Sequence, residues 1–158
     1  MLDWLWKNGH QPVFVPMNTV TPDDDRIVSH MIMERAEFGR EVLLIDGEIF
    51  PRDVANVYSH CQAAFVARVH GSVTALLGRC PVLMYAFDLK HGGIMEQMGL
   101  SGQVFSPETG SPKDAVEMMG EVLRSRTRLI AQMEEKAREL QEQAKITRDA
   151  VLRLRDAK

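Results

Sequence analysis

The chain has 158 residues, the size of one ordinary domain, which excludes a large multidomain enzyme. A hydrophobic content of 45%, with only 7 prolines and 11 glycines, excludes a disordered or collagen-like chain. The formal net charge of −3 gives no broad positive surface for a phosphate backbone, so we expect no nucleic-acid partner.

The first 111 residues alternate strand and helix patterns. Residues 2–7, closed by Gly9, have the pattern of the last turns of a helix. Such a short helix is unstable alone, so we expect a fragment of a longer protein, with a native short first helix as the alternative. The predicted strands cover residues 13–18, 41–46, 64–70, 81–87 and 103–105. The predicted helices begin at Thr21, Pro51 and Gly71, and a fourth ends at Met98.

This alternation predicts the fold class. The predicted strand 64–70 is apolar on both faces, which is typical of a parallel sheet covered by helices. Short connections between alternating strands and helices predict an α/β fold with an open, doubly wound, Rossmann-like parallel sheet. Its crossovers should be right-handed, whereas the strand order does not follow from the sequence.

A different texture begins at residue 112. After Pro112 the chain has no further proline and a single glycine, Gly120, which predicts one long helix of about 45 residues and nearly 70 Å. We therefore divide the chain into a Rossmann-like lobe, residues 1–111, and a long amphipathic helix, residues 112–158. The lobe is acidic, with 13 acidic and 8 basic side chains, whereas the helix has 9 acidic and 11 basic ones.

The C-terminal segment carries a heptad pattern. Positions spaced alternately by three and four residues form a seam that is apolar except at Arg126 and Thr147. A self-associating coiled coil is the favoured interpretation, and we expect a homo-oligomer. Docking of the helix along the lobe, or on a missing N-terminal lobe, is the alternative. The seam consists of Val116, Met119, Leu123, Arg126, Ile130, Met133, Ala137, Leu140, Ala144, Thr147, Val151 and Leu154.

Polar residues gather where the predicted strands end, which is where open α/β sheets bind ligands. Arg68 and His70 lie two residues apart on one predicted strand and should share a face. The next helix begins at Gly71 and Ser72, whose backbone N–H groups lack helical partners. Lys90 follows the neighbouring predicted strand. An arginine, an imidazole, a lysine and a helix N-terminus together predict an anion-binding site.

The same residues admit a structural interpretation. Arg68 would then pair with Asp46 or Asp88 as an ion bridge, and His70 would cap a helix. The anion site is the sharper hypothesis, because a charged side chain inside an apolar strand is rarely kept for packing alone.

Other chemistry is expected to be absent. The remaining histidines have no metal-ligand spacing, so we expect no metal and no cofactor. Cys61 and Cys80 are too few for a disulfide framework and are interpreted as small buried hydrophobes in a reducing cytoplasm. No run reaches the ~18 apolar residues of a membrane span, and residues 1–16 lack the pattern of a secretion signal. The four histidines are His10, His30, His60 and His91.

An ordered series of motifs runs through the second half of the predicted lobe: Ala67-Arg68-Val69-His70-Gly71, Ala75-Leu76-Leu77-Gly78, Pro81-Val82-Leu83, Tyr85, Lys90 and Met98-Gly99-Leu100. This series resembles the C-terminal half of the polysaccharide pyruvyl transferase family. That family has Arg-Leu-His-Ala at a strand end, a small-residue helix ending in Gly, and a Lys after a Pro-led strand. Val69 and Gly71 depart mildly from the pattern. The resemblance covers about residues 10–105, one lobe of a two-lobe, GT-B-like enzyme.

The resemblance implies an activity. The family transfers a pyruvyl group from phosphoenolpyruvate to two hydroxyls of a glycan acceptor as a ketal, during exopolysaccharide or cell-wall glycan synthesis. It implies that Arg68 and His70 contact the phosphate and carboxylate of phosphoenolpyruvate and that Lys90 matches the family's lysine. We assign His70 to acid–base chemistry, and Asp88 as a base or an orienting group. Because the family's first lobe is missing, we expect the chain to be incomplete as an enzyme.

Two other functions compete with this one. A GT-B glycosyltransferase lobe would bind the diphosphate of a sugar nucleotide in the same crevice. A non-catalytic α/β module would use the C-terminal helix for oligomerisation. The pair of Arg68 and His70, with Lys90 downstream, favours the pyruvyl transferase interpretation.

Overall fold

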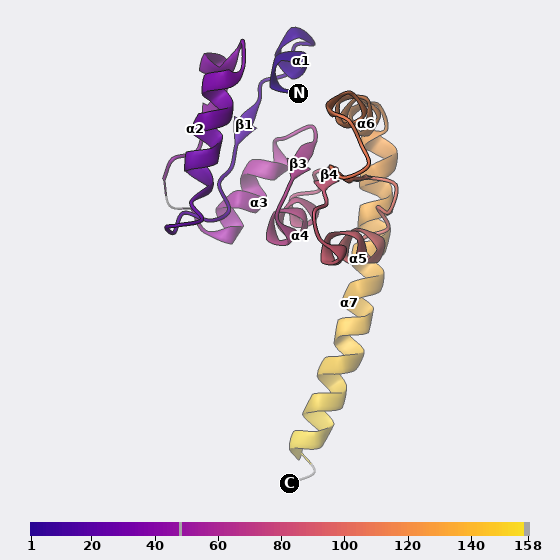
Figure 1. The fold of residues 1–158 in the computed structure, drawn as a ribbon. Helices are drawn as coiled ribbons and strands as arrows, with labels where there is room; N and C mark the ends of the chain where they lie inside the picture. Colours follow the sequence, from indigo (N-terminus) through magenta and orange to yellow (C-terminus); the bar gives the residue numbers. More distant parts are fainter. Residues whose placement is uncertain (48, 157–158) are drawn as a thin grey trace.

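The computed structural model describes residues 1–47 and 49–156, and it shows an α/β protein with small parallel sheets and a long C-terminal helix (Figure 1). One sheet pairs β1 with β2, and Val13 lies opposite Leu43. The other has the order β3-β4-β5, with all pairs parallel. The strands are β1 (Val13–Phe14), β2 (Leu43–Leu44), β3 (Ala64–Val66), β4 (Val82–Tyr85) and β5 (Val104–Phe105).

The α/β class and the parallel pairing of the strands agree with the prediction from the sequence. The expected single open sheet is divided, because no hydrogen bonds join β1 to β3 among the described residues. None of the described helices is both long and apolar enough to cross a membrane. The helices are α1 (Leu2–Lys7), α2 (Asp25–Arg35), the short 3₁₀ helix η1 (Gly39–Glu41), α3 (Pro51–Ser59), α4 (Val69–Leu77), α5 (Leu89–Gln97), α6 (Pro112–Arg124) and α7 (Arg126–Asp156).

Side-chain caps explain where several helices begin. Asp24 caps α2 by accepting a hydrogen bond from the Arg26 N–H at 2.9 Å. Asp88 caps α5 in the same way. Ser111, directly before Pro112, forms a capping box with Asp114 at the start of α6. The residues of each cap are neighbours in the sequence, so the starts of these helices can be predicted without knowledge of the tertiary structure.

The core lies around β4, the central strand of the larger sheet. Val82, Leu83 and Met84 are fully buried there. Helices α5 and α6 contribute Met95 and Met119 to the same cluster. The first turns of α7 add further apolar side chains to it, namely Leu129 and Met133. The apolar surface removed from water by this cluster is the main stabilising contribution to the lobe.

The strand predicted at 64–70 is shorter than expected. It ends at Val66, and Arg68 already serves as the N-cap of α4. The expectation that both faces are buried is wrong for this strand, because Phe65 is 43% exposed. The strand with both faces buried is β4, whose Val82 and Leu83 point to opposite faces and are both buried.

The helix predicted from residue 112 onward is divided. The backbone leaves helical geometry at Ser125, whose hydroxyl donates to Glu121 Oε1 at 2.6 Å. The long C-terminal helix is α7, with 31 residues, and it follows the separate α6. The axes of α6 and α7 run in different directions (Figure 1), and both helices contribute apolar side chains to the core.

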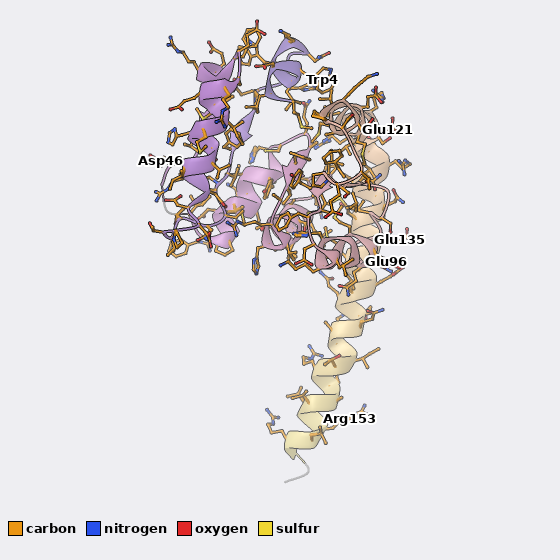
Figure 2. All side chains as sticks on the ribbon, in the orientation of Figure 1. Trp4, Asp46, Glu96, Glu121, Glu135 and Arg153 are labelled. Carbon is orange, nitrogen blue, oxygen red and sulfur yellow. The ribbon has the colours of Figure 1, made fainter. Side chains whose placement is uncertain are left out.

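The second half of α7 leaves the lobe. Every side chain described from residue 141 to residue 155 is exposed, whereas Met133 is buried. Figure 2 shows this part of the helix, including Arg153, with no neighbouring element beside it. The docking alternative therefore applies to the first turns of α7, and the distal half of the seam has no partner within the described chain.

Candidate anion-binding pocket

A pocket of about 660 Å³ lies beside the ends of β3 and β4. It is lined by residues 67–70, which lead from β3 into α4, and by Phe87 and residues of α5. Parallel strands place these two connections at the same edge of the sheet, which is where α/β proteins bind ligands. The pocket brings together Arg68, His70 and Lys90, three of the residues that the sequence singled out.

Arg68 is held by an ion pair with Asp25. Its Nη2 lies 2.7 Å from Asp25 Oδ1, and its Nε donates to both carboxylate oxygens at 3.0 and 3.1 Å. Nη2 also donates to the backbone carbonyl of Asp23. The structural interpretation correctly included an ion bridge, but the predicted partners Asp46 and Asp88 were wrong.

This ion pair connects two parts of the lobe. Asp25 also accepts hydrogen bonds from the backbone N–H groups of Met17 and Asn18, both at 3.0 Å. Burial raises the pKa of the Asp25 carboxyl, but these hydrogen bonds and the Arg68 guanidinium outweigh burial and leave the pKa below its ordinary value of 3.8. The hydrogen bonds to Asp25 in turn raise the pKa of Arg68. Arg68 therefore carries its charge at every physiological pH.

His70 lines the pocket from the first turn of α4 and is exposed. The prediction that Arg68 and His70 share one strand face is wrong, because the chain has already turned into a helix at Val69. The two side chains still meet the same pocket, through the cap and first turn of α4.

Gly71 and Ser72 do not line the pocket. Both are buried, and a Cβ added to Gly71 would lie 2.6 Å from Val66 Cγ1. The Ser72 hydroxyl donates to the carbonyl of Val69 at 2.7 Å. Gly71 thus allows α4 to pack closely on β3, and the hydroxyl of Ser72 is used within its own helix.

Lys90 and Asp88 form a pair at the start of α5. Lys90 Nζ lies 3.2 Å from Asp88 Oδ2, and the Lys90 N–H donates to Asp88 Oδ1 at 3.3 Å. The backbone and side-chain hydrogen bonds from Lys90 hold the pKa of Asp88 below its usual range. A carboxylate with a lowered pKa is a poor proton acceptor near neutral pH, and Asp88 is not among the lining residues. Its position suits the orientation of Lys90.

The lining residues Phe87 and His91 were not predicted as part of the site. His91 is buried, and its ring centroid lies 4.5 Å from that of Phe87. His91 Nδ1 lies 3.1 Å from the carbonyl oxygen of Asp88. A signal was present in the sequence, because a residue three positions after a capping Asp occupies the first turn of the helix that starts there.

The lining is basic and partly apolar. It contains no acidic side chain among the described residues. Two of its cations, Arg68 and Lys90, form ion pairs with Asp25 and Asp88, which do not line the pocket. No group of three His, Cys, Asp or Glu side chains in the described residues could hold a metal ion. Burial raises the pKa of the Cys80 thiol to about 12, so this thiol stays protonated and unreactive. Anion binding is the chemistry that this arrangement supports.

Comparisons of the chain with protein-family models, with curated proteins and with solved structures give no match. The motif series places its charged members, Arg68, His70 and Lys90, around one pocket.

Proposed function

We propose that this chain binds phosphoenolpyruvate in the pocket beside β3 and β4, as the donor-binding lobe of a transferase similar to the polysaccharide pyruvyl transferases. The observation that carries the proposal is the position of Arg68, His70 and Lys90. These side chains come from two neighbouring strand–helix connections and line one pocket. All strand pairs are parallel, which supports the further proposal that the two sheets belong to one Rossmann-like, GT-B-like lobe.

The ligand class follows from the charges. Phosphoenolpyruvate has a phosphate and a carboxylate, so it needs several cationic donors in one small space. Arg68 uses Nε and Nη2 for Asp25 and Asp23, while its Nη1 makes no hydrogen bond to any residue that the structure describes. It can therefore bind an anion without giving up its ion pair. Lys90 supplies a second cation from the facing connection.

The proposed reaction assigns a role to each residue. A proton is added to the methylene carbon of phosphoenolpyruvate, the first sugar hydroxyl adds to C2 and loses its proton, and inorganic phosphate leaves when the second hydroxyl attacks. The second hydroxyl also loses its proton, and the product is a ketal. His70 is proposed to carry protons, because an imidazole has one nitrogen that can donate a proton and one that can accept it. Arg68 and Lys90 are proposed to hold the phosphate, and Asp88 to orient Lys90.

Calorimetric titration with phosphoenolpyruvate tests the proposal. It measures binding, since the resemblance covers one lobe of a two-lobe enzyme. Replacing Lys90 by Met should raise the dissociation constant by about tenfold or more, because a charge-assisted contact is lost. The control is Lys113→Met on α6, which removes a cation outside the pocket that is 84% exposed, against 63% for Lys90. It should leave the affinity unchanged.

The outcomes separate the competing functions. An equal loss of affinity in both lysine variants would indicate nonspecific attraction and would contradict the proposed pocket. Binding of a sugar nucleotide, with no response to phosphoenolpyruvate, would support the glycosyltransferase alternative. If neither ligand binds, the donor-binding function is wrong and the non-catalytic module gains support.

A further inference from the structure

Helix α2 exposes its apolar side. Ile27, Val28, Met31 and Ile32 are between 42% and 55% exposed, and their spacing places them along one side of the helix. The opposite side packs on the lobe through Ser29, which is buried. A surface helix normally turns its apolar stripe inward, so this arrangement is reversed. We call these four residues the α2 face.

A second apolar surface lies on the distal half of α7. Val151 and Leu154 are 60% and 71% exposed, and Ala144 is exposed two turns before Val151. These three residues, the α7 stripe, lie on one side of the helix by their spacing. Figure 1 shows that the distal half of α7 extends away from the lobe, on the side remote from α2. The stripe therefore does not reach the α2 face of its own chain.

We propose that the α7 stripe of one copy packs on the α2 face of a second copy. Charge complementarity selects this occupant. Residues 20–46 around α2 carry seven acidic and three basic side chains, and the paired Lys7 and Arg68 reduce the net charge there from −4 to −2. Residues 141–158 carry three acidic and five basic side chains, a net charge of +2. Two basic α7 segments repel each other, so a second α7 is a poorer partner for the stripe than the acidic segment around α2. Pairing of α7 with α2 joins opposite charges and covers both apolar surfaces.

The edges of the two surfaces match as well. Glu34 lies one turn after Met31, at the edge of the α2 face, and is exposed. Arg148 lies one turn before Val151, at the edge of the α7 stripe, with a side chain that is 63% exposed. When each copy places its α7 stripe on the α2 face of the other, the two contacts are equivalent and form a closed two-fold dimer. This inference does not depend on the proposed ligand.

Disulfide trapping gives the direct test. A chain carrying Met31→Cys is mixed with a chain carrying Val151→Cys, both in a Cys61→Ser background, because Cys61 is the less buried native thiol. The proposal expects a cross-linked product in the mixture and little in either chain alone. A cross-link in the Val151→Cys chain alone would reveal an α7–α7 coiled coil and overturn the proposal. Replacing Met31→Cys by Lys113→Cys, at a side chain 84% exposed, gives the control for random collision.

A charge exchange tests the same contact in solution. Light scattering should give a mass near twice 17.9 kDa for the unmodified chain. Glu34→Arg and Arg148→Glu should each raise the dimer dissociation constant by about tenfold, and the double variant should restore it. A chain that stays monomeric at high concentration would overturn the proposal. So would a double variant whose dimer is as weak as the sum of the two single losses.

Discussion

At the scale of residues, Arg68 has two roles. It lines the pocket and it also connects the start of α4 to Asp25 at the start of α2. The sequence marked Arg68 as unusual because a charged side chain followed an apolar strand. It did not identify the partner, because Asp25 lies 43 residues away and only the folded chain brings the two together.

The lowered pKa of Asp25 leads to a test of this connection. A carboxyl whose pKa is lower in the folded state stabilises the fold above its unfolded pKa, and that contribution is lost as the pH falls through the folded value. Removal of the charge in Asp25→Asn should lower the free energy of unfolding at pH 7 by about 1–3 kcal/mol. The difference from the unmodified chain should shrink below the ordinary Asp pKa of 3.8.

Urea unfolding at a series of pH values measures both effects. Other carboxyls with lowered pKa values, such as Asp88 and Asp114, remain in the variant, so its stability should still decline in acid, with a smaller slope. A variant whose unfolding free energy runs parallel to that of the unmodified chain down to acidic pH would contradict the role of Asp25.

At the scale of elements, local signals in the sequence predict which helices and strands form, whereas tertiary packing decides where some of them end. The sequence predicted the order of strands and helices, because caps and apolar runs are local. It placed the end of β3 too late, since the apolar Ala67 and Val69 continue the alternating pattern after the strand has ended at Val66. It also missed the break at Ser125, because no glycine or proline marks that position. The break lies between two helices, α6 and α7, that both contribute side chains to the core.

The contact between α3 and α4 provides a prediction for packing. A Cβ on Gly78 would lie 2.6 Å from the backbone oxygen of Ala55, which cannot move without shifting α3. Gly78→Ala should therefore destabilise the fold by about 1–3 kcal/mol through overpacking. Gly92→Ala, inside α5, is the matched control, because its Cβ would meet nothing within 4 Å. It should stabilise the fold by about 0.5–1 kcal/mol.

Thermal or urea unfolding of both alanine variants distinguishes the two effects. The same side chain is added in each case, so opposite changes in the midpoint follow from the packing alone. Equal stabilities of the two variants would show that α3 and α4 are not held as closely as the structure has them.

At the scale of the whole molecule, the chain consists of a packed lobe and a projecting helix. The side chains described from residue 141 to residue 155 are all exposed, so removing residues 141–158 should leave the unfolding midpoint of the lobe nearly unchanged at low concentration. The same truncation should abolish the dimer expected for the full chain. Light scattering and thermal unfolding of the truncated chain measure the two results separately, and a large loss of stability would assign the distal helix to the lobe itself.

We propose that the pocket lined by Arg68, His70 and Lys90 binds phosphoenolpyruvate. The most direct measurement follows the amide resonances of the isotopically labelled chain by NMR during titration with this ligand. We predict saturable shifts concentrated in residues 67–70 and 87–97, and their loss in Lys90→Met. Absence of shifts at millimolar ligand, or shifts confined to the basic distal half of α7, would contradict the account.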